Sequence, residues 1–209
     1  MKKLIVIVTV ILFSLNVSAQ KVNLGLKFSP HISWIKSDFS NTISNDGAGV
    51  NFSYGLMLDY NFTDNYALNF DIDFATLKYT TSHLDSINTI ITKWKQQYVN
   101  IPVAIKMKTN EIANMKFFGK IGISPMLNTS ARLNNQSNSD QVNFFNAQFF
   151  IGAGVQYYLL GNTAFMAGLT YHNGLLRMNR KKSTIFPEID LTDIALKPNY
   201  ISLDLGIIF

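Results

Sequence analysis

The sequence predicts an all-β protein, an eight-stranded, antiparallel, up-and-down transmembrane β-barrel. Three observations lead to this fold class. Apolar and polar residues alternate over eight segments, and period two is the pattern of a strand with two different faces. The connections between these segments alternate strictly between short and long. The chain has 16 Phe and 9 Tyr but only 15% charged residues, a composition that suits a surface covered by lipid better than one covered by water.

The segment 1–19 has the features of a secretory signal peptide. Two lysines precede an apolar run that ends at Leu15, and small residues follow as far as Ala19. Cleavage after Ala19 would leave residues 20–209 as the outer-membrane β-barrel domain. The apolar run is shorter than the roughly 20 residues that a transmembrane helix needs, and no comparable run follows it. Since the chain has no cysteine, the sequence offers neither a lipoprotein anchor nor a disulfide framework.

The net charge argues against nucleic acid as a partner. Without Lys2 and Lys3 of the signal segment, the 18 basic residues fall to 16 against 13 acidic ones, which gives a net charge of +3. No basic stripe with interleaved aromatic residues accompanies this small excess. The densest basic run, from Arg177 to Lys182, is expected in a loop, where it is solvated or meets acidic lipopolysaccharide headgroups.

The first three strands are expected at residues 22–34, 50–62 and 66–79. The second shows the alternation most clearly, because every second residue from Val50 to Phe62 is apolar and the residues between them are mostly polar or small. In the third, the phase is expected to slip near Ala75, after which Leu77 and Tyr79 carry the outward pattern. A β-bulge near the barrel rim would explain that slip.

The remaining five strands are expected at residues 94–107, 117–127, 144–158, 163–175 and 197–209. Pro102 cannot donate a ladder hydrogen bond, so the fourth strand needs a bulge or a local break there. Gly152 and Gly154 are expected to point inward, where they let a narrow barrel curl. The last strand ends on an outward Phe209. This ending resembles that of bacterial outer-membrane barrels, whose final strand is read by the barrel-assembly machinery during insertion.

The lengths of the connections predict how the barrel is oriented. The short gaps are 61–65, 108–115 and 160–162, and the long gaps are 35–49, 81–93, 128–143 and 177–197. Even-stranded outer-membrane barrels have short periplasmic turns and long outer loops, so we expect the cell outer membrane as the location. Trp34 and Trp94 lie near strand ends and are expected at the outer membrane interface.

Eight ionisable side chains are expected to form a charge network in the lumen. They are Lys27, Asp59, Asp71, Asp73, Lys106, Lys120, His172 and Asp204. Side chains fill the interior of an eight-stranded barrel, and a buried charge needs a partner, so a plug of paired charges is favoured over a proton or ion path. Asp71 and Asp73 share a face, but no third ligand follows at a readable spacing, so neither a metal site nor a cofactor is predicted.

The three histidines are candidate catalytic groups, because some outer-membrane barrels are enzymes. His31 precedes Ser33 by two residues, and His83 precedes Asp85 by two, so each pair would share a strand face. A nucleophile also needs an orienting third group, and none is readable. The sequence therefore predicts no enzyme, with a lipid or peptide hydrolase at the barrel rim as the alternative. His172 is expected inside the barrel, hydrogen-bonded to a lumen neighbour.

Four segments resemble the PorT-like outer-membrane β-barrel family of Bacteroidota. They are residues 25–30, 98–106, 151–157 and 171–175, of which 98–106 is the most specific. The resemblance implies an eight-stranded barrel without enzymatic chemistry, and one member type serves secretion across the outer membrane. We therefore expect a structural or interaction role, accessory to secretion or envelope assembly, with outer-membrane lipid, lipopolysaccharide and envelope proteins as partners. A soluble periplasmic ligand-binding barrel is the second alternative, because lipocalins also have eight antiparallel strands.

Overall fold

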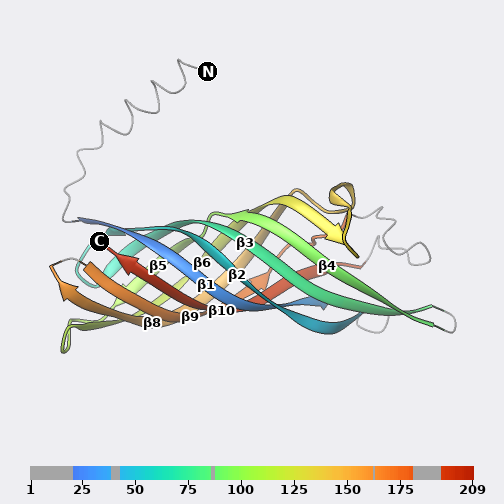
Figure 1. Cartoon of the computed structure of the whole chain (residues 1–209). Helices are drawn as coiled ribbons and strands as arrows, with labels where there is room; N and C mark the ends of the chain where they lie inside the picture. Colours follow the sequence, from blue (N-terminus) through green and yellow to red (C-terminus); the bar gives the residue numbers. More distant parts are fainter. Residues whose placement is uncertain (1–20, 39–42, 86–87, 162, 181–193) are drawn as a thin grey trace, which may run out of the picture.

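The computed structural model describes residues 21–38, 43–85, 88–161, 163–180 and 194–209 (Figure 1). The predicted signal segment 1–19 lies outside this range. The elements in chain order are β1 (Val22–Ser37), β2 (Ser44–Asn61), β3 (Tyr66–Asp85), β4 (Asn88–Asn100), β5 (Val103–Lys108), β6 (Met115–Leu133), β7 (Gln136–Ser137), the 3₁₀ turn η2 (Ser139–Gln141), β8 (Phe145–Leu160), β9 (Thr163–Gly174) and β10 (Leu196–Ile208). Within the described residues, no helix is long and apolar enough to cross a membrane.

The strands form one antiparallel sheet that closes into a ring. The order around the ring is β1, β10, β9, β8, β6, β4 with β5, β3 and β2, and β2 pairs again with β1. Strands β4 and β5 share one place between β3 and β6, so the ring has eight positions. At the seam, Phe209 N donates to Leu24 O at 2.7 Å, and Leu24 N donates to Phe209 O at 3.3 Å. The predicted eight-stranded, up-and-down barrel is confirmed.

Pro102 divides the fourth position of the ring by a local break. Strand β4 ends at Asn100 and β5 begins at Val103. Across the break, Ile101 N donates to Pro125 O at 2.9 Å, and the Pro102 carbonyl accepts from Asp71 N at 3.0 Å. The neighbouring strands therefore bridge the gap with the backbone groups that proline leaves available.

The prediction of four long connections is wrong for 35–49 and 81–93, because β1 and β2 extend to Ser37 and Ser44, and β3 and β4 extend to Asp85 and Asn88. Tight turns lie at the end of the barrel that holds Lys21 and Phe209, and the turn after β5 places Ala113 and Asn114 at positive φ. The opposite end carries the two long connections, from β6 to β8 and from β9 to β10, and the short ones from β1 to β2 and from β3 to β4. There β3 and β4 stay paired as far as Asp85 and Asn88, and this hairpin projects beyond its neighbours (Figure 1). We call the two ends the turn end and the loop end.

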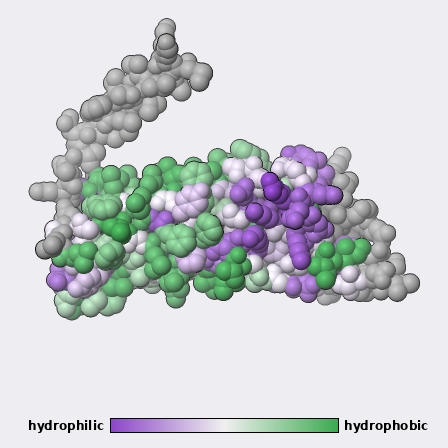
Figure 2. Space-filling view, viewed as in Figure 1, coloured by the Kyte–Doolittle hydropathy of each residue, from purple (hydrophilic) through white to green (hydrophobic). Residues whose placement is uncertain are grey.

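The outer wall is apolar over the part nearer the turn end, and a hydrophilic patch lies nearer the loop end (Figure 2). The exposed apolar side chains of the outer wall include Leu26, Phe28, Leu56, Ile72, Phe74, Ile121, Ile151, Phe165, Leu169, Leu203 and Leu205. On each strand the intervening residues are mostly buried. A continuous apolar wall of this kind requires lipid around it.

The expected phase slip in β3 is wrong. Alternate residues of β3 stay buried from Ala67 to His83, so Leu77 and Tyr79 face the interior and not the lipid. The irregularity lies on the neighbouring strand, where β2 advances five residues from Ala48 to Ser53 while β3 advances four. The bulge therefore belongs to β2. The interior of the barrel changes from polar to apolar at this height.

Candidate functional site: the filled barrel interior

The interior holds three layers of side chains. At the turn end, Met57, Phe118, Met166 and Ile208 form a small apolar cluster. The middle layer contains Lys27, Lys120 and three aspartates, and a larger apolar cluster lies toward the loop end. The pair of Lys106 and Asp59 lies beside the turn-end cluster, with Lys106 Nζ 4.8 Å from the Phe118 ring centroid. All eight residues that the sequence predicts for the lumen network lie inside the barrel and are buried.

Lys27 joins two carboxylates of β3 from the far side of β2. Its Nζ lies 2.6 Å from Asp71 Oδ2 and 2.7 Å from Asp73 Oδ2. The side chain crosses β2 at Gly55, which is its register partner. A Cβ on Gly55 would lie 2.4 Å from Asp73 Oδ1 and 2.1 Å from the Ile72 carbonyl oxygen. The absence of a side chain at Gly55 is therefore a condition of this ion pair.

Two further lysines each hold one aspartate. Lys106 Nζ lies 2.6 Å from Asp59 Oδ2, and Lys120 Nζ lies 2.8 Å from Asp204 Oδ2. Lys106 on β5 and Lys120 on β6 are direct register partners. Their two positive charges repel each other, and the ion pairs with Asp59 and Asp204 offset that repulsion. The partners are 47 and 84 residues apart in the sequence, so these ion pairs form only when distant strands assemble in the sheet.

Neutral side chains complete the network. Asn69 Nδ2 lies 2.9 Å from Asp59 Oδ1 and 2.8 Å from Asp71 Oδ1, which links the first two ion pairs. Asp204 accepts hydrogen bonds from Thr170 at 2.6 Å and from Ser202 at 2.9 Å. Buried carboxylates need such donors because ion pairing alone does not replace the water that they lose.

The middle layer leaves little free space. A polar cavity of about 10 Å³ is lined by residues of the network, including Lys27, Asp73, Lys120 and Asp204. A single water needs at least about 10–15 Å³. The cavity among these residues therefore has about the volume of one water.

An aromatic stack lies on the loop side of the ions. The His172 and Tyr200 rings are 3.9 Å apart between centroids and inclined by 16°, and Phe150 lies 5.4 Å from His172 on the other side. His31 adds a fourth ring, 5.0 Å from Tyr200. His172 therefore contacts the rings of Phe150 and Tyr200. The expected hydrogen bond to a lumen neighbour is not found among the described residues, where Nδ1 has no partner.

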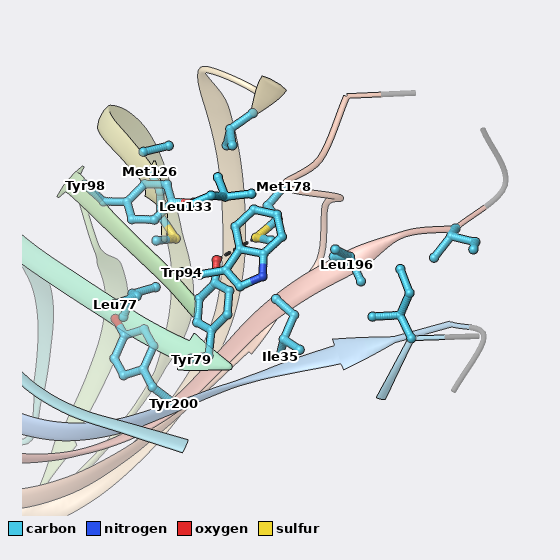
Figure 3. Close-up of a cluster of buried hydrophobic side chains, with 14 residues drawn as sticks. Ile35, Leu77, Tyr79, Trp94, Tyr98, Met126, Leu133, Met178, Leu196 and Tyr200 are labelled. Atoms are coloured by element: carbon cyan, nitrogen blue, oxygen red, sulfur yellow. Dashed lines mark hydrogen bonds between the residues drawn. The ribbon is translucent and has the colours of Figure 1, made fainter. Parts of the chain in front are cut away.

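The larger apolar cluster, which we call the outer cluster, closes the loop end of the interior (Figure 3). It consists of Ile35, Ile43, Leu77, Tyr79, Trp94, Tyr98, Met126, Ala131, Leu133, Val142, Met178, Ile194, Leu196 and Tyr200. Met178 comes from the connection after β9, and its Sδ lies 2.7 Å from the Tyr79 hydroxyl. A loop residue therefore helps to cap the barrel.

Two tyrosines anchor the outer cluster to one amide. The hydroxyls of Tyr79 and Tyr98 each donate to Gln96 Oε1 at 2.6 Å. Tyr79 lies on the loop side of the apolar wall, and burial raises the pKa of its phenol well above the ordinary value. The hydroxyl therefore keeps its proton for this bond at neutral pH.

The expected interfacial position of Trp94 is wrong. Its side chain is 2% exposed inside the outer cluster, and Nε1 donates to Thr81 Oγ1 at 2.9 Å. Trp34, on the outer wall, stacks on Tyr171 at 6.3 Å between centroids. The sequence signal for the outer cluster was the apolar character of Leu77 and Tyr79 in the inward phase of β3, which the expected slip concealed.

The first histidine pair, His31 and Ser33, does not form a catalytic arrangement. His31 is 2% exposed, and its ring nitrogens lie 3.2 Å from the Ser29 carbonyl and 2.9 Å from the Thr76 carbonyl. Ser33 Oγ donates to the Lys78 carbonyl at 2.7 Å. Both members of this pair are thus engaged with backbone. The Asp85 side chain lies outside the described part of the chain, so the second pair is not tested.

The aspartate carboxylates in the lumen form ion pairs with lysines. Asp71 and Asp73, which share a face as the sequence predicts, both contact Lys27. Across the described residues, no group of three His, Asp or Glu side chains is arranged to hold a metal ion.

A closed antiparallel barrel with an apolar outer wall and an ionic interior defines an outer-membrane β-barrel protein. Residues 18–175 match the family described as "Outer membrane protein beta-barrel domain", so the chain belongs to this family. Its location is the cell outer membrane, as the sequence predicts. This location excludes the alternative of a soluble periplasmic barrel.

Two solved structures share the fold. Neisserial surface protein A is 14% identical, with 88% of this chain and 95% of that chain covered and a TM-score of 0.54. OprG from Pseudomonas aeruginosa is 11% identical, with 90% and 97% covered and a TM-score of 0.55. A comparison with curated proteins finds no match in sequence.

The buried ion pair of Lys120 and Asp204 predicts a strong penalty for removing one partner. Asp204→Asn leaves the Lys120 charge buried and unpaired, so we expect the free energy of unfolding to fall by about 3–5 kcal/mol. The double variant Lys120→Met/Asp204→Leu removes both charges and should recover most of that loss. Urea unfolding in lipid vesicles measures both variants.

The partly exposed pair of Lys116 and Glu111, with Nζ and Oε2 3.9 Å apart, supplies the control. Lys116→Met should change the free energy of unfolding by less than about 1 kcal/mol. Equal effects of Lys116→Met and Asp204→Asn would contradict the ionic layer.

The two tryptophans of the chain predict different fluorescence. In the Trp34→Phe variant, the remaining Trp94 should resist quenching by both acrylamide and brominated lipid, because the outer cluster surrounds it. In the Trp94→Phe variant, brominated lipid should quench Trp34 several-fold more strongly. Equal quenching by brominated lipid in the two variants would place Trp94 on the outer wall.

Proposed function

We propose that this protein is a non-conducting outer-membrane barrel with a structural or interaction role. The observation that carries this proposal is the filled interior. Two lysines and three aspartates, Lys27, Lys120, Asp71, Asp73 and Asp204, line a cavity of only about 10 Å³, and apolar clusters lie toward the turn end and toward the loop end. A barrel of eight strands is just wide enough for its own side chains, so the lumen serves cohesion and the surfaces are left for recognition.

We further propose that the barrel is of the PorT-like kind and accessory to secretion or envelope assembly. The resemblance of residues 98–106 to that family supports this. The segment includes Pro102, which divides the strand into β4 and β5. The projecting hairpin of β3 and β4 and the loop that contains η2 offer the surfaces for envelope protein partners. Loops on a rigid scaffold usually carry binding function. Phe209 lies outward at the seam, which supports a role as the signal for the assembly machinery.

A rim-located hydrolase finds no support in the described histidines. The His31 ring nitrogens lie against backbone carbonyls, and Ser33 donates to another carbonyl. A serine nucleophile requires a hydrogen bond to its base. The proposed role therefore involves no reaction at this pair.

Planar bilayer recording tests the non-conducting role. We expect the purified, folded protein to give no stable single-channel steps in 1 M KCl, because paired side chains occupy the lumen. Protease protection of the same reconstituted sample confirms insertion, and a porin recorded in the same bilayer confirms sensitivity. Reproducible steps from inserted protein would overturn the proposal.

A further inference from the structure

Three cations form a row on the outer wall near the loop end. Lys78 on β3 is the direct register partner of Lys95 on β4, and Lys95 is the direct partner of Arg132 on β6. Side chains that are directly opposite on neighbouring strands have Cβ atoms about 4.5–5.5 Å apart. Their chain neighbours Leu77, Trp94 and Leu133 are buried in the outer cluster, so the three cations point away from the interior. We call them the basic row.

The basic row has no acidic partner among the described residues. The ion pairs of this part of the chain involve Lys27, Lys106, Lys116, Lys120 and Lys197. Like charges directly opposite in a sheet repel each other, so the row costs stability unless an anion is bound. On the other side of the barrel, Lys197 is placed opposite Lys36 but has Asp38 at 3.1 Å.

Two further rows lie beneath the basic row on the same three strands. The nearer one is polar and uncharged, with Thr76 opposite Gln97 and Gln97 opposite Ser130. The farther one is apolar, with Phe74 opposite Val99 and Val99 opposite Leu127. The outer wall therefore changes from apolar to neutral to cationic over four residues of β3.

The distance between the apolar and basic rows matches a lipid headgroup. Four residues span about 13 Å along a strand, and a strand tilt of about 45° reduces this to about 9 Å along the membrane normal. Figure 2 shows the corresponding change from a hydrophobic to a hydrophilic surface toward the loop end. The charges therefore lie at the depth of the headgroups of the outer leaflet, and the apolar row lies at the depth of the acyl chains.

We propose that the basic row binds the phosphate groups of an anionic glycolipid of the outer leaflet. An arginine guanidinium offers paired donors to phosphate oxygens, and each lysine adds a mobile point charge. The apolar row on the same strands contacts the acyl chains of the same lipid. This continuity favours a lipid over free phosphate, which would need only the charges. The inference rests on the outer-membrane location and is independent of conduction.

Native mass spectrometry of the detergent-solubilised, folded protein tests this inference, with bisphosphorylated lipid A as the probe. The variant Lys78→Gln/Lys95→Gln should bind it at least about tenfold more weakly, since each basic residue contributes about a factor of five near an anionic membrane surface. The matched control Lys21→Gln/Lys116→Gln removes the same charge at the turn end and should bind as the unchanged protein does. Faster migration of unboiled samples confirms that both variants are folded.

Two further arms identify the source of the phosphate. Dephosphorylated lipid A should bind the unchanged protein about as weakly as the row variant binds the probe, and 10 mM inorganic phosphate should not displace the probe. Equal losses in the row and control variants would reduce the effect to net charge and overturn the inference. So would equal binding of dephosphorylated lipid A, or displacement by inorganic phosphate.

Discussion

The structure depends on the requirement that a sheet in lipid satisfies all of its backbone hydrogen bonds. No water is available to an open strand edge in the bilayer core, so the sheet must close. The seam between β1 and β10 meets this requirement, down to the bonds between Leu24 and Phe209. Closure with eight strands fixes a narrow bore, and a narrow bore must be filled by the side chains that point into it.

Because side chains fill the interior, the interior and the outer surface have different roles. Charges that would be costly in isolation are held in pairs between strands that are distant in sequence, as Lys27 is with Asp71 and Asp73. Apolar clusters seal this layer on both sides, and Met178 brings a loop into the outer one. With the interior committed to cohesion, recognition falls to the outer wall and the loop end. The basic row occupies that wall at the depth where anionic headgroups lie.

The alternation of apolar and polar residues predicted most of the fold, because one face of each strand meets lipid and the other face meets the polar lumen. The alternation gave a wrong prediction at the end of the barrel beyond the lipid. Beyond the lipid, the interior itself becomes apolar, so Leu77, Tyr79 and Trp94 could be assigned to the wrong face. The accommodation of Pro102 depends on Asp71 and Pro125, which no local pattern connects. Loop residues such as Met178 have no periodicity, so their place in the outer cluster could not be predicted.

The most direct test of the account is a disulfide across the seam. Leu26 and Ile207 are register partners of β1 and β10, and the chain has no other cysteine to interfere. We predict that the Leu26→Cys/Ile207→Cys protein forms an intramolecular disulfide on mild oxidation in isolated outer membranes, because paired Cα atoms lie within disulfide range. Leu26→Cys/Leu203→Cys, displaced by four residues, should not. Absence of the first disulfide, or equal formation of both, would contradict a closed barrel with this register.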